Sequence, residues 1–298
     1  MSLTKVALLS VAAVVHADNE IAVLQSLRRA YPEWKPRGVV DVGANKGGWT
    51  TKLQQLFPNV TTMMIEGSPS HVKQLQETKL KYDGAVDYQV ALLSTTDGGI
   101  VEFFDNPDTN TGNSMFQENT KYFKDVKPQT RTTSKLDTLV SHMGSIDYVK
   151  LDVQGAELLV LSGAEETLKK TTFVQLEISI IEYNKGGACW SEIDSFLQER
   201  GFNLYDIGEI NRNWALFNTK GVGQLDLLYI RPDSDFLPQW LLEHKVQFCG
   251  SSRKATEPSG YKSITAGENF HFAILGLVAF GVGYILGRRK DKSGLKEN

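Results

Sequence analysis

The residues best placed to do chemistry surround a short glycine-rich segment, residues 39–50 (VVDVGANKGGWT). An apolar run ends on Asp41, and a turn that contains Gly43, Asn45 and Gly47 separates this run from a helix-like segment. A buried strand, a tight turn and a helix in this order are where α/β sheets bind nucleotides. The sequence therefore predicts a nucleotide-type cofactor site at this turn.

The details of the turn favour S-adenosylmethionine over a dinucleotide. A dinucleotide site requires the pattern G-x-G-x-x-G, which lets a pyrophosphate approach the start of the helix. Here Asp41 stands in place of the first glycine, and the spacing from Gly43 to Gly47 does not match. S-adenosylmethionine carries a cationic sulfonium and an ammonium instead of a phosphate, so a carboxylate at the strand end suits its charge. A glycine-rich turn without a ligand is the alternative interpretation.

A second acid ends the next apolar run. Glu66 lies 25 residues after Asp41, near the separation at which an acid on the second strand meets ribose hydroxyls. A carboxylate can accept hydrogen bonds from both hydroxyls at once. The segment 67–70 (GSPS) then turns the chain and caps the next helix. We expect Glu66 to bind a ribose; the alternative is a solvated strand end.

A further group of ionisable residues lies in residues 150–157 (KLDVQGAE). Strand alternation places Lys150 and Asp152 on one side of a strand. Glu157 stands at the start of a helix, where a negative charge is favourable. Ionisable residues are rarely so dense in a buried strand without a function or partners. We expect a functional role for this group; a Lys150–Asp152 ion pair beside a helix start is the alternative.

Alternating strand and helix patterns along residues 18–235 predict the elements that position these side chains. Strands are predicted at residues 39–42, 61–65, 86–92, 98–104, 148–151, 173–178, 203–205 and 225–230. Helices are predicted at residues 18–33, 49–57, 70–82, 158–170 and 190–200. Such alternation indicates a mostly parallel sheet covered on both faces, and the β-rich ending predicts an antiparallel last strand. Residues 98–104 are expected in a hairpin, and the polar excursion 105–135 is expected to be a binding loop.

Several of these segments together resemble the FkbM family of S-adenosylmethionine-dependent methyltransferases. The matching segments, in the family's order over roughly residues 37–207, are DVGANKGG, IEGSPS, VALLSTTDG, SKLDTL, VKLDVQGAELLVLSGAEETL and FVQLEIS. The resemblance implies a class I methyltransferase fold, which is a Rossmann-like three-layer α/β sandwich. Its seven-stranded sheet is mostly parallel with an antiparallel last strand. The resemblance also implies O-methylation, often of a sugar hydroxyl in a glycan or natural product.

The resemblance also implies roles for individual residues. Those assigned to S-adenosyl-L-methionine are Asp41, Gly43, Asn45, Gly47, Glu66, Ser68, Ala91 and Leu92. Those placed at the reaction end, and so assigned to catalysis, are Asp152, Lys150 and Glu157. An alcohol must lose its proton during methyl transfer, and we expect Asp152 to be the base or acceptor-binding group, with His142 as a less favoured alternative. The family often has Glu-Pro after its second strand, where this chain has Glu66 followed by Gly-Ser-Pro. It often has a glutamate where this chain has Gln154, which argues against any role that needs a carboxylate there.

Two other classes of protein remain open from the sequence alone. One is a catalytically inactive, membrane-anchored module that binds S-adenosylmethionine. The other is a nicotinamide dehydrogenase, which the turn at Asp41 disfavours. The net charge of −3, without a basic stripe, argues against a nucleic-acid partner. The two cysteines and five histidines have no metal-ligand spacing, so we expect no metal site.

The composition outside the domain predicts a membrane protein. Residues 1–17 resemble a secretory signal peptide, residues 236–269 a linker, residues 270–287 a transmembrane helix and residues 288–298 a basic tail. The basic tail favours a cytosolic end and a domain, residues 18–235, in the lumen of the secretory pathway. A tail-anchored protein that faces the cytosol is the alternative. Small residues recur every four positions at Ala279, Gly283 and Gly287, a pattern compatible with a homodimer.

Overall fold

The structure is a computed structural model that describes residues 21–109, 111–212 and 221–232. The chain divides into two compact units, residues 1–248 and 249–298, and every described residue belongs to the first. The predicted signal peptide, linker, transmembrane helix and basic tail lie outside the described residues. Among the described residues, no helix combines the length and the apolar character that crossing a membrane requires.

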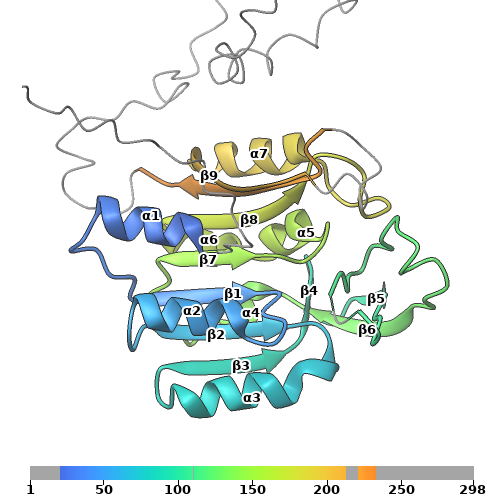
Figure 1. Cartoon of the computed structure of the whole chain (residues 1–298), viewed down its shortest axis with the longest axis horizontal. Coiled ribbons are helices and arrows are strands. Elements are labelled where there is room, and N and C mark those ends of the chain that lie inside the picture. The colour runs from blue at the N-terminus through green and yellow to red at the C-terminus, as the bar shows by residue number, and fades with distance from the viewer. Residues whose placement is uncertain (1–20, 110, 213–220, 233–298) are drawn as a thin grey trace, which may run out of the picture. The chain divides into compact units, whose positions relative to one another are not determined.

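A seven-stranded sheet forms the centre of the domain (Figure 1). Its strands in spatial order are β3 (Val86–Val90), β2 (Thr61–Glu66), β1 (Gly38–Val42), β7 (Tyr148–Leu151), β8 (Phe173–Ser179), β10 (Gln224–Ile230) and β9 (Asn203–Asn211). The last strand, β10, runs antiparallel to both neighbours, and the other paired strands are parallel. This confirms the predicted mostly parallel sheet with an antiparallel last strand.

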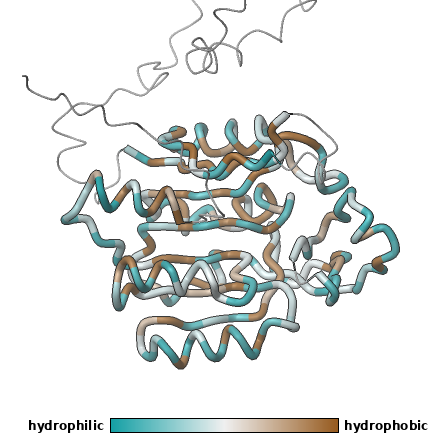
Figure 2. The backbone as a smooth tube through the Cα atoms, in the orientation of Figure 1, coloured by the Kyte–Doolittle hydropathy of each residue, from teal (hydrophilic) through white to brown (hydrophobic). Residues whose placement is uncertain are grey.

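Helices cover both faces of the sheet and give three layers. Helices α1 (Ala22–Ala30) and α2 (Gly48–Leu56) pack on one face. Helices α4 (Leu136–Leu139), α5 (Glu157–Ser162), α6 (Glu165–Lys170) and α7 (Trp190–Glu199) pack on the other. The short helix η1 (Pro69–His71) and α3 (Val72–Lys81) follow β2. The helices alternate hydrophobic and hydrophilic positions along their length (Figure 2), because each buries one side on the sheet.

The central strand β1 is buried at all five positions, which explains its near-continuous apolar sequence. Asp41 is the exception, since it is a fully buried acid in that run. The predicted helix at residues 18–33 is shorter than expected. It begins at Ala22 without a side-chain cap, although its expected apolar positions, among them Leu24 and Leu27, are buried.

Two predicted elements are each divided in the structure. The predicted helix 158–170 becomes α5 and α6, which are separated by Gly163 and Ala164. Gly163 also lies against the chain near Ser94. A Cβ atom at Gly163 would lie 2.2 Å from the Ser94 carbonyl oxygen. The predicted strand 86–92 ends at Val90, and Leu92 and Leu93 form a separate strand, β4. This strand leaves the main sheet to pair with β6 (Gln129–Ser134).

The predicted hairpin at residues 98–104 has a distant partner. Strand β5 (Ile100–Phe103) pairs antiparallel with β6, on the other side of the long excursion, and β4, β6 and β5 form a small three-stranded sheet. The turn signal at residues 97–99 therefore does not join two adjacent strands. This small sheet anchors both ends of the excursion beside the carboxyl ends of the main strands (Figure 1).

Candidate active site

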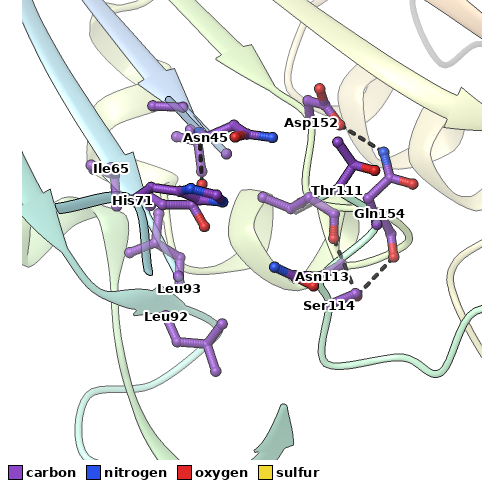
Figure 3. Close-up of a pocket in the computed structure, with 18 of the residues that line it drawn as sticks. Asn45, Ile65, His71, Leu92, Leu93, Thr111, Asn113, Ser114, Asp152 and Gln154 are labelled. Carbon is purple, nitrogen blue, oxygen red and sulfur yellow. Dashed lines mark hydrogen bonds between the residues drawn. The ribbon is translucent and has the colours of Figure 1, made fainter. Parts of the chain in front are cut away.

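A cavity of about 340 Å³ lies at the carboxyl ends of β1, β2 and β7 (Figure 3). Its walls come from the turn after β1, the end of β2, the chain after β3, the excursion at residues 111–115 and the loop after β7. Pockets for small molecules and cofactors measure roughly 300–1,000 Å³. The cavity is therefore large enough for a cofactor, and part of the predicted binding loop lines it.

The turn after β1 needs glycine for two separate reasons. Gly43 and Gly47 have positive φ angles of 72° and 76°, a region that glycine enters without strain. Gly43 also leaves no space for a side chain, because a Cβ atom there would lie 1.8 Å from the Asp152 carbonyl oxygen. The turn after β1 and the loop after β7 therefore touch through their backbones.

Glu66 is buried at the end of β2 and is held by the backbone at both carboxylate oxygens. Its Oε2 accepts a hydrogen bond from the Asn45 N–H (2.8 Å), and its Oε1 accepts one from the Ser68 N–H (2.7 Å). Burial raises the pKa of Glu66 above its usual value, and these two hydrogen bonds oppose that rise. The carboxylate lines the cavity in a fixed orientation.

Apolar side chains form the wall beside Glu66. Ile65, Leu92, Leu93 and Phe103 line this part of the cavity, together with the buried side chain of His71 (Figure 3). This wall is suited to a flat, weakly polar ring. The sequence predicted Ala91 and Leu92 here. It missed His71 and Phe103, because their positions depend on η1 and on the small sheet.

The eight residues predicted to bind the cofactor fall into two groups. Those that line the cavity are Gly43, Asn45, Glu66, Ala91 and Leu92; those that lie behind its wall are Asp41, Gly47 and Ser68. Asp41 accepts a hydrogen bond from the Thr50 hydroxyl (2.7 Å). The Ser68 hydroxyl donates to Asp105 (3.0 Å). Both residues support the wall through these contacts.

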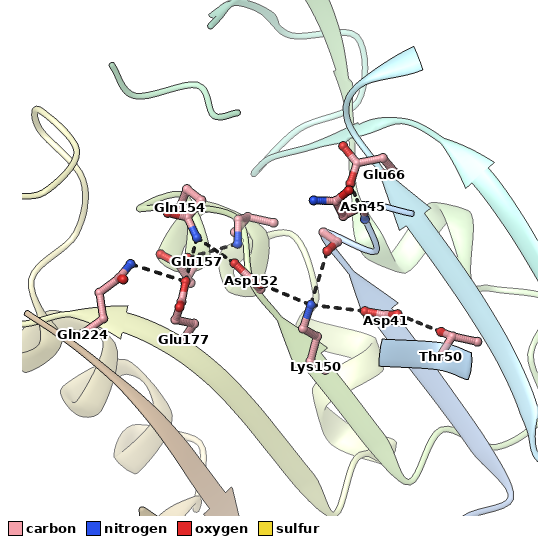
Figure 4. A network of polar contacts seen from close by, with 12 residues as sticks. Asp41, Asn45, Thr50, Glu66, Lys150, Asp152, Gln154, Glu157, Glu177 and Gln224 are labelled. Atoms are coloured by element: carbon pink, nitrogen blue, oxygen red, sulfur yellow. Dashed lines mark hydrogen bonds and ion pairs between the residues drawn. The ribbon is translucent and has the colours of Figure 1, made fainter. Parts of the chain in front are cut away.

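Lys150 joins the ends of the two neighbouring strands β1 and β7 through one ammonium group (Figure 4). Its Nζ lies 3.3 Å from Asp41 Oδ1 and 3.5 Å from Asp152 Oδ2, and it donates a hydrogen bond to the Gly43 carbonyl oxygen (3.3 Å). The Lys150–Asp152 ion pair considered from the sequence is therefore present. The Asp152 side chain remains 35% exposed, whereas that of Lys150 is only 9% exposed. Asp152 thus keeps access to the cavity while Lys150 holds it.

Gln154 bridges two carboxylates on the wall opposite Glu66. Its Nε2 donates to Asp152 Oδ1 (2.8 Å) and to Glu177 Oε2 (2.6 Å). The backbone of Gln154 has a φ of 53°, and its carbonyl oxygen accepts a hydrogen bond from the Ser114 hydroxyl (2.8 Å). Burial and the neighbouring carboxylate of Asp152 raise the pKa of Glu177 well above its usual range. The sequence analysis assigned no role to Glu177, although this residue lies in the motif FVQLEIS.

Glu157 lies under the loop after β7 and does not line this cavity. Its Oε1 accepts hydrogen bonds from the backbone N–H groups of Val153 and Gly155, each at 3.2 Å. Burial raises the pKa of Glu157 to about 7. The contacts of this residue hold the loop that carries Asp152 and Gln154. Among the described residues, no group of three His, Cys, Asp or Glu side chains could hold a metal ion.

The sheet order, the antiparallel last strand and a cavity at the carboxyl ends of the parallel strands together define a class I methyltransferase fold. The chain belongs to the FkbM family, since the family model described as "Methyltransferase FkbM domain" matches residues 41–204. This confirms the predicted family. The matched domain is described as a methyltransferase, and it contains the carboxyl ends of the strands that surround the cavity.

Individual proteins similar to this chain are more distant. The 2-O-methyltransferase NoeI of Sinorhizobium fredii is 28% identical over an alignment of 163 residues, which covers 50% of this chain and 65% of that protein. The chain thus spans just under two thirds of the length of this relative. A magnesium protoporphyrin IX methyltransferase from Synechocystis PCC 6803, solved with bound S-adenosylmethionine, has a TM-score of 0.42 and 13% identity over 71% of this chain and 77% of its own. A precorrin-6y C5,15-methyltransferase from Geobacter metallireducens has a TM-score of 0.41 and 10% identity over 74% and 91%.

The lining residues fit S-adenosylmethionine in their chemistry. Glu66 presents a fixed carboxylate to hydroxyl donors, and the apolar wall at Leu92 and Phe103 suits a purine ring. The carboxylate of Asp152 on the opposite wall suits a cationic group. S-adenosylmethionine has no phosphate and needs no phosphate-binding turn, which agrees with the prediction that the turn at Asp41 favours this cofactor over a dinucleotide.

Proposed function

We propose that this methyltransferase acts on oxygen and methylates a hydroxyl group of a glycan or another small acceptor. The observation that carries the proposal is the pair of carboxylates, Asp152 and Glu177, on one wall of the cofactor cavity. The resemblance to the FkbM family and the similarity to a protein named as a 2-O-methyltransferase support the same reaction. An alcohol needs such a proton acceptor, because its oxygen is a weak nucleophile while it carries the proton.

The chemistry divides between the cofactor and the protein. When bound, S-adenosylmethionine supplies a methyl group on a cationic sulfur, which keeps the bonding electron pair as the acceptor oxygen bonds to the methyl carbon. Asp152 accepts the hydroxyl proton, and Lys150 orients the Asp152 carboxylate. Gln154 fixes the two carboxylates relative to each other. The remaining requirement is position, since holding two reactants in line accounts for much of the acceleration in such displacements.

Calorimetry and methyl transfer on the purified full-length chain test this proposal. We expect S-adenosylhomocysteine to bind with micromolar affinity, about −8 kcal/mol, and NAD not to bind. Label from tritiated S-adenosylmethionine should appear as base-stable methyl ethers in glycans or small molecules of the source cells. Binding without transfer would instead favour an inactive module, and tight NAD binding would favour a dehydrogenase.

The variant Asp152→Asn separates catalysis from cofactor binding. An amide keeps the shape of the side chain but cannot take the hydroxyl proton, so turnover should fall roughly 10²- to 10⁴-fold. The affinity for S-adenosylhomocysteine should change far less. An unchanged rate of transfer in this variant would remove Asp152 from the mechanism.

We also propose that residues 270–287 anchor the enzyme in a membrane. The uncharged, apolar composition of this segment and the basic cluster at residues 288–290 support an anchor with a cytosolic tail. The apolar run at residues 6–15, within the segment that resembles a signal peptide, supports a lumenal domain. S-adenosylmethionine is made in the cytosol, so a lumenal enzyme requires transport of the cofactor. A tail-anchored enzyme that faces the cytosol does not, and it remains the second arrangement.

A further inference from the structure

A second cavity, of about 160 Å³, adjoins the cofactor cavity. Four residues line both cavities, namely Trp49, Lys150, Asp152 and Glu177. The polar residues that line only the second cavity are Gln175, Glu209, Asn211, Gln224 and Asp226. They come from β8, β9 and β10, which take no part in the cofactor turn. The two cavities therefore meet at the pair of carboxylates that the proposed reaction uses.

One face of the sheet changes from apolar to polar side chains halfway along its strands, and the second cavity lies over the polar half. Tyr148 and Phe173 belong to the apolar core that packs with helices α1 and α2. Two residues further along the same strands, and so on the same face, stand Lys150 and Gln175. On β10 the same change separates Leu228 from Asp226. Helices α1 and α2 therefore cover the apolar half of this face, and the second cavity lies over its polar half.

In the polar half, two acidic side chains lie opposite each other on neighbouring strands, which by itself destabilises the fold. Glu177 on β8 lies directly opposite Asp226 on β10 in the antiparallel register. Like charges in this position destabilise a sheet. Burial, Asp152 and Asp226 all raise the pKa of Glu177. A ligand that donates hydrogen bonds to these carboxylates would relieve the repulsion, whereas an apolar pair would serve the fold better.

The lining of the second cavity selects among acceptors by charge. Four acidic side chains line it, from Asp152, Glu177, Glu209 and Asp226. Among the described residues, the one cation that lines it is Lys150, which is already within ion-pair distance of Asp41 and Asp152. A phosphate, sulfate or carboxylate on the acceptor would meet a wall of like charge. Hydroxyl groups would instead find acceptors in the carboxylates and both acceptors and donors in the three amides.

We propose that the second cavity binds the acceptor, and that this acceptor is a hydroxyl-rich molecule without anionic groups, such as a neutral or amino sugar. Its reacting hydroxyl lies where the cavities meet, between Asp152 and Glu177. This inference rests on the proposed function and adds to it the location and charge class of the acceptor. Glu209 and Asp226 are binding residues, since they line the acceptor cavity alone.

Charge fractionation of the acceptor pool tests the charge class. Glycans and small molecules from the source cells are divided on an anion-exchange column and incubated with the full-length protein and tritiated S-adenosylmethionine. We expect the label in the unretained fraction. Label in the retained fraction alone overturns the proposed acceptor class. Label in neither fraction from a protein that binds S-adenosylhomocysteine would count against the proposed function. Failure to bind S-adenosylhomocysteine would instead overturn the proposed function.

Two conservative variants test the location. Glu209→Gln and Asp226→Asn should each lower transfer to the unretained fraction roughly tenfold, the effect of losing one hydrogen bond to a charged group. Neither should change the affinity for S-adenosylhomocysteine by as much as about twofold, because neither residue lines the cofactor cavity. Glu102→Gln, at an exposed position of β5, is the matched control and should change neither quantity. Unchanged transfer in both test variants, or an equal loss of cofactor affinity, contradicts the location.

Discussion

At the scale of single residues, Glu66 is the contact whose replacement is easiest to interpret. Both of its oxygens already accept backbone N–H groups, from Asn45 and Ser68. In Glu66→Gln the amide NH₂ must face one of these donors, and one acceptor for ribose hydroxyls is lost. We expect the affinity for S-adenosylhomocysteine to fall roughly tenfold in calorimetry. Glu102→Gln is the control for a general effect of charge.

The pH dependence of binding gives a second measure of the same carboxylate. Burial raises the pKa of Glu66, and only the ionised form accepts hydrogen bonds at both oxygens without donating one. Wild-type affinity should therefore fall as the pH is lowered through this raised pKa, and Glu66→Gln should lack that part of the dependence. Identical pH profiles for the two proteins would argue against a direct contact with the cofactor.

Residues close in sequence were predictable from types and spacing, whereas those brought in by distant elements were not. Glu66 is found from its distance to Asp41, and Lys150 and Asp152 from strand alternation, because both signals are local. Glu177 reaches the site only because β8 lies beside β7. Gln154 looked like the loss of a carboxylate, yet its amide supplies the donor that two carboxylates share.

At the scale of elements, the turn after β1 and the loop after β7 form a close backbone contact. Gly43→Ala would place a methyl group 1.8 Å from the Asp152 carbonyl oxygen and strain a positive φ angle. We expect a lower melting temperature and loss of S-adenosylhomocysteine binding. Gly48→Ala, five residues along, meets nothing within 4 Å and should melt at or near the wild-type temperature. Equal melting temperatures for both variants would contradict this packing.

The start of α5 carries a measurable dependence of stability on pH. The pKa of Glu157 stands at about 7 in the folded protein against 4.5 for a free side chain. The folded protein thus holds this proton more tightly than the unfolded chain, so its contribution to the free energy of unfolding falls as the pH rises from about 4.5 to 7. The full loss above pH 7 is on the order of 3 kcal/mol.

Glu157→Gln should remove that loss, because the amide oxygen can accept the same two backbone hydrogen bonds without a charge. The variant should gain stability relative to the wild type as the pH rises from 5 to 8. Thermal unfolding across this range measures the difference, and the subtraction cancels the titration of other groups. A difference that stays constant with pH would show that Glu157 does not titrate in this window.

The order of the elements was predictable because each strand carries its own apolar run, but their breaks and partners were not. Nothing local marks Ala91 as the point where the chain leaves the main sheet, since the apolar run continues through Leu93. The partner of β5 is β6, and 25 residues separate the two strands. The short helix α4 also escaped prediction, as four residues give too little periodicity.

At the scale of the whole molecule, membrane attachment is the prediction to test. Full-length protein should remain in the membrane pellet after alkaline carbonate extraction, and a chain that ends at residue 269 should be extracted. Protease treatment of intact microsomes then distinguishes the two topologies, because a lumenal domain is protected until detergent is added. Extraction of the full-length protein would mean that residues 270–287 do not span a membrane.

The position of Lys150 makes the two cavities parts of a single energetic system. Its ammonium contacts the cofactor turn at Gly43, the buried Asp41 and the reactive Asp152, and it lines both cavities. A ligand in either cavity changes the charge balance around this one group and therefore the electrostatic potential felt by a ligand in the other. Thermodynamic reciprocity requires that each ligand alter the affinity for its companion by the same factor. An affinity measured for the cofactor alone thus applies only while the second cavity is empty. The acceptor should likewise bind the cofactor-free and cofactor-loaded forms with different affinities.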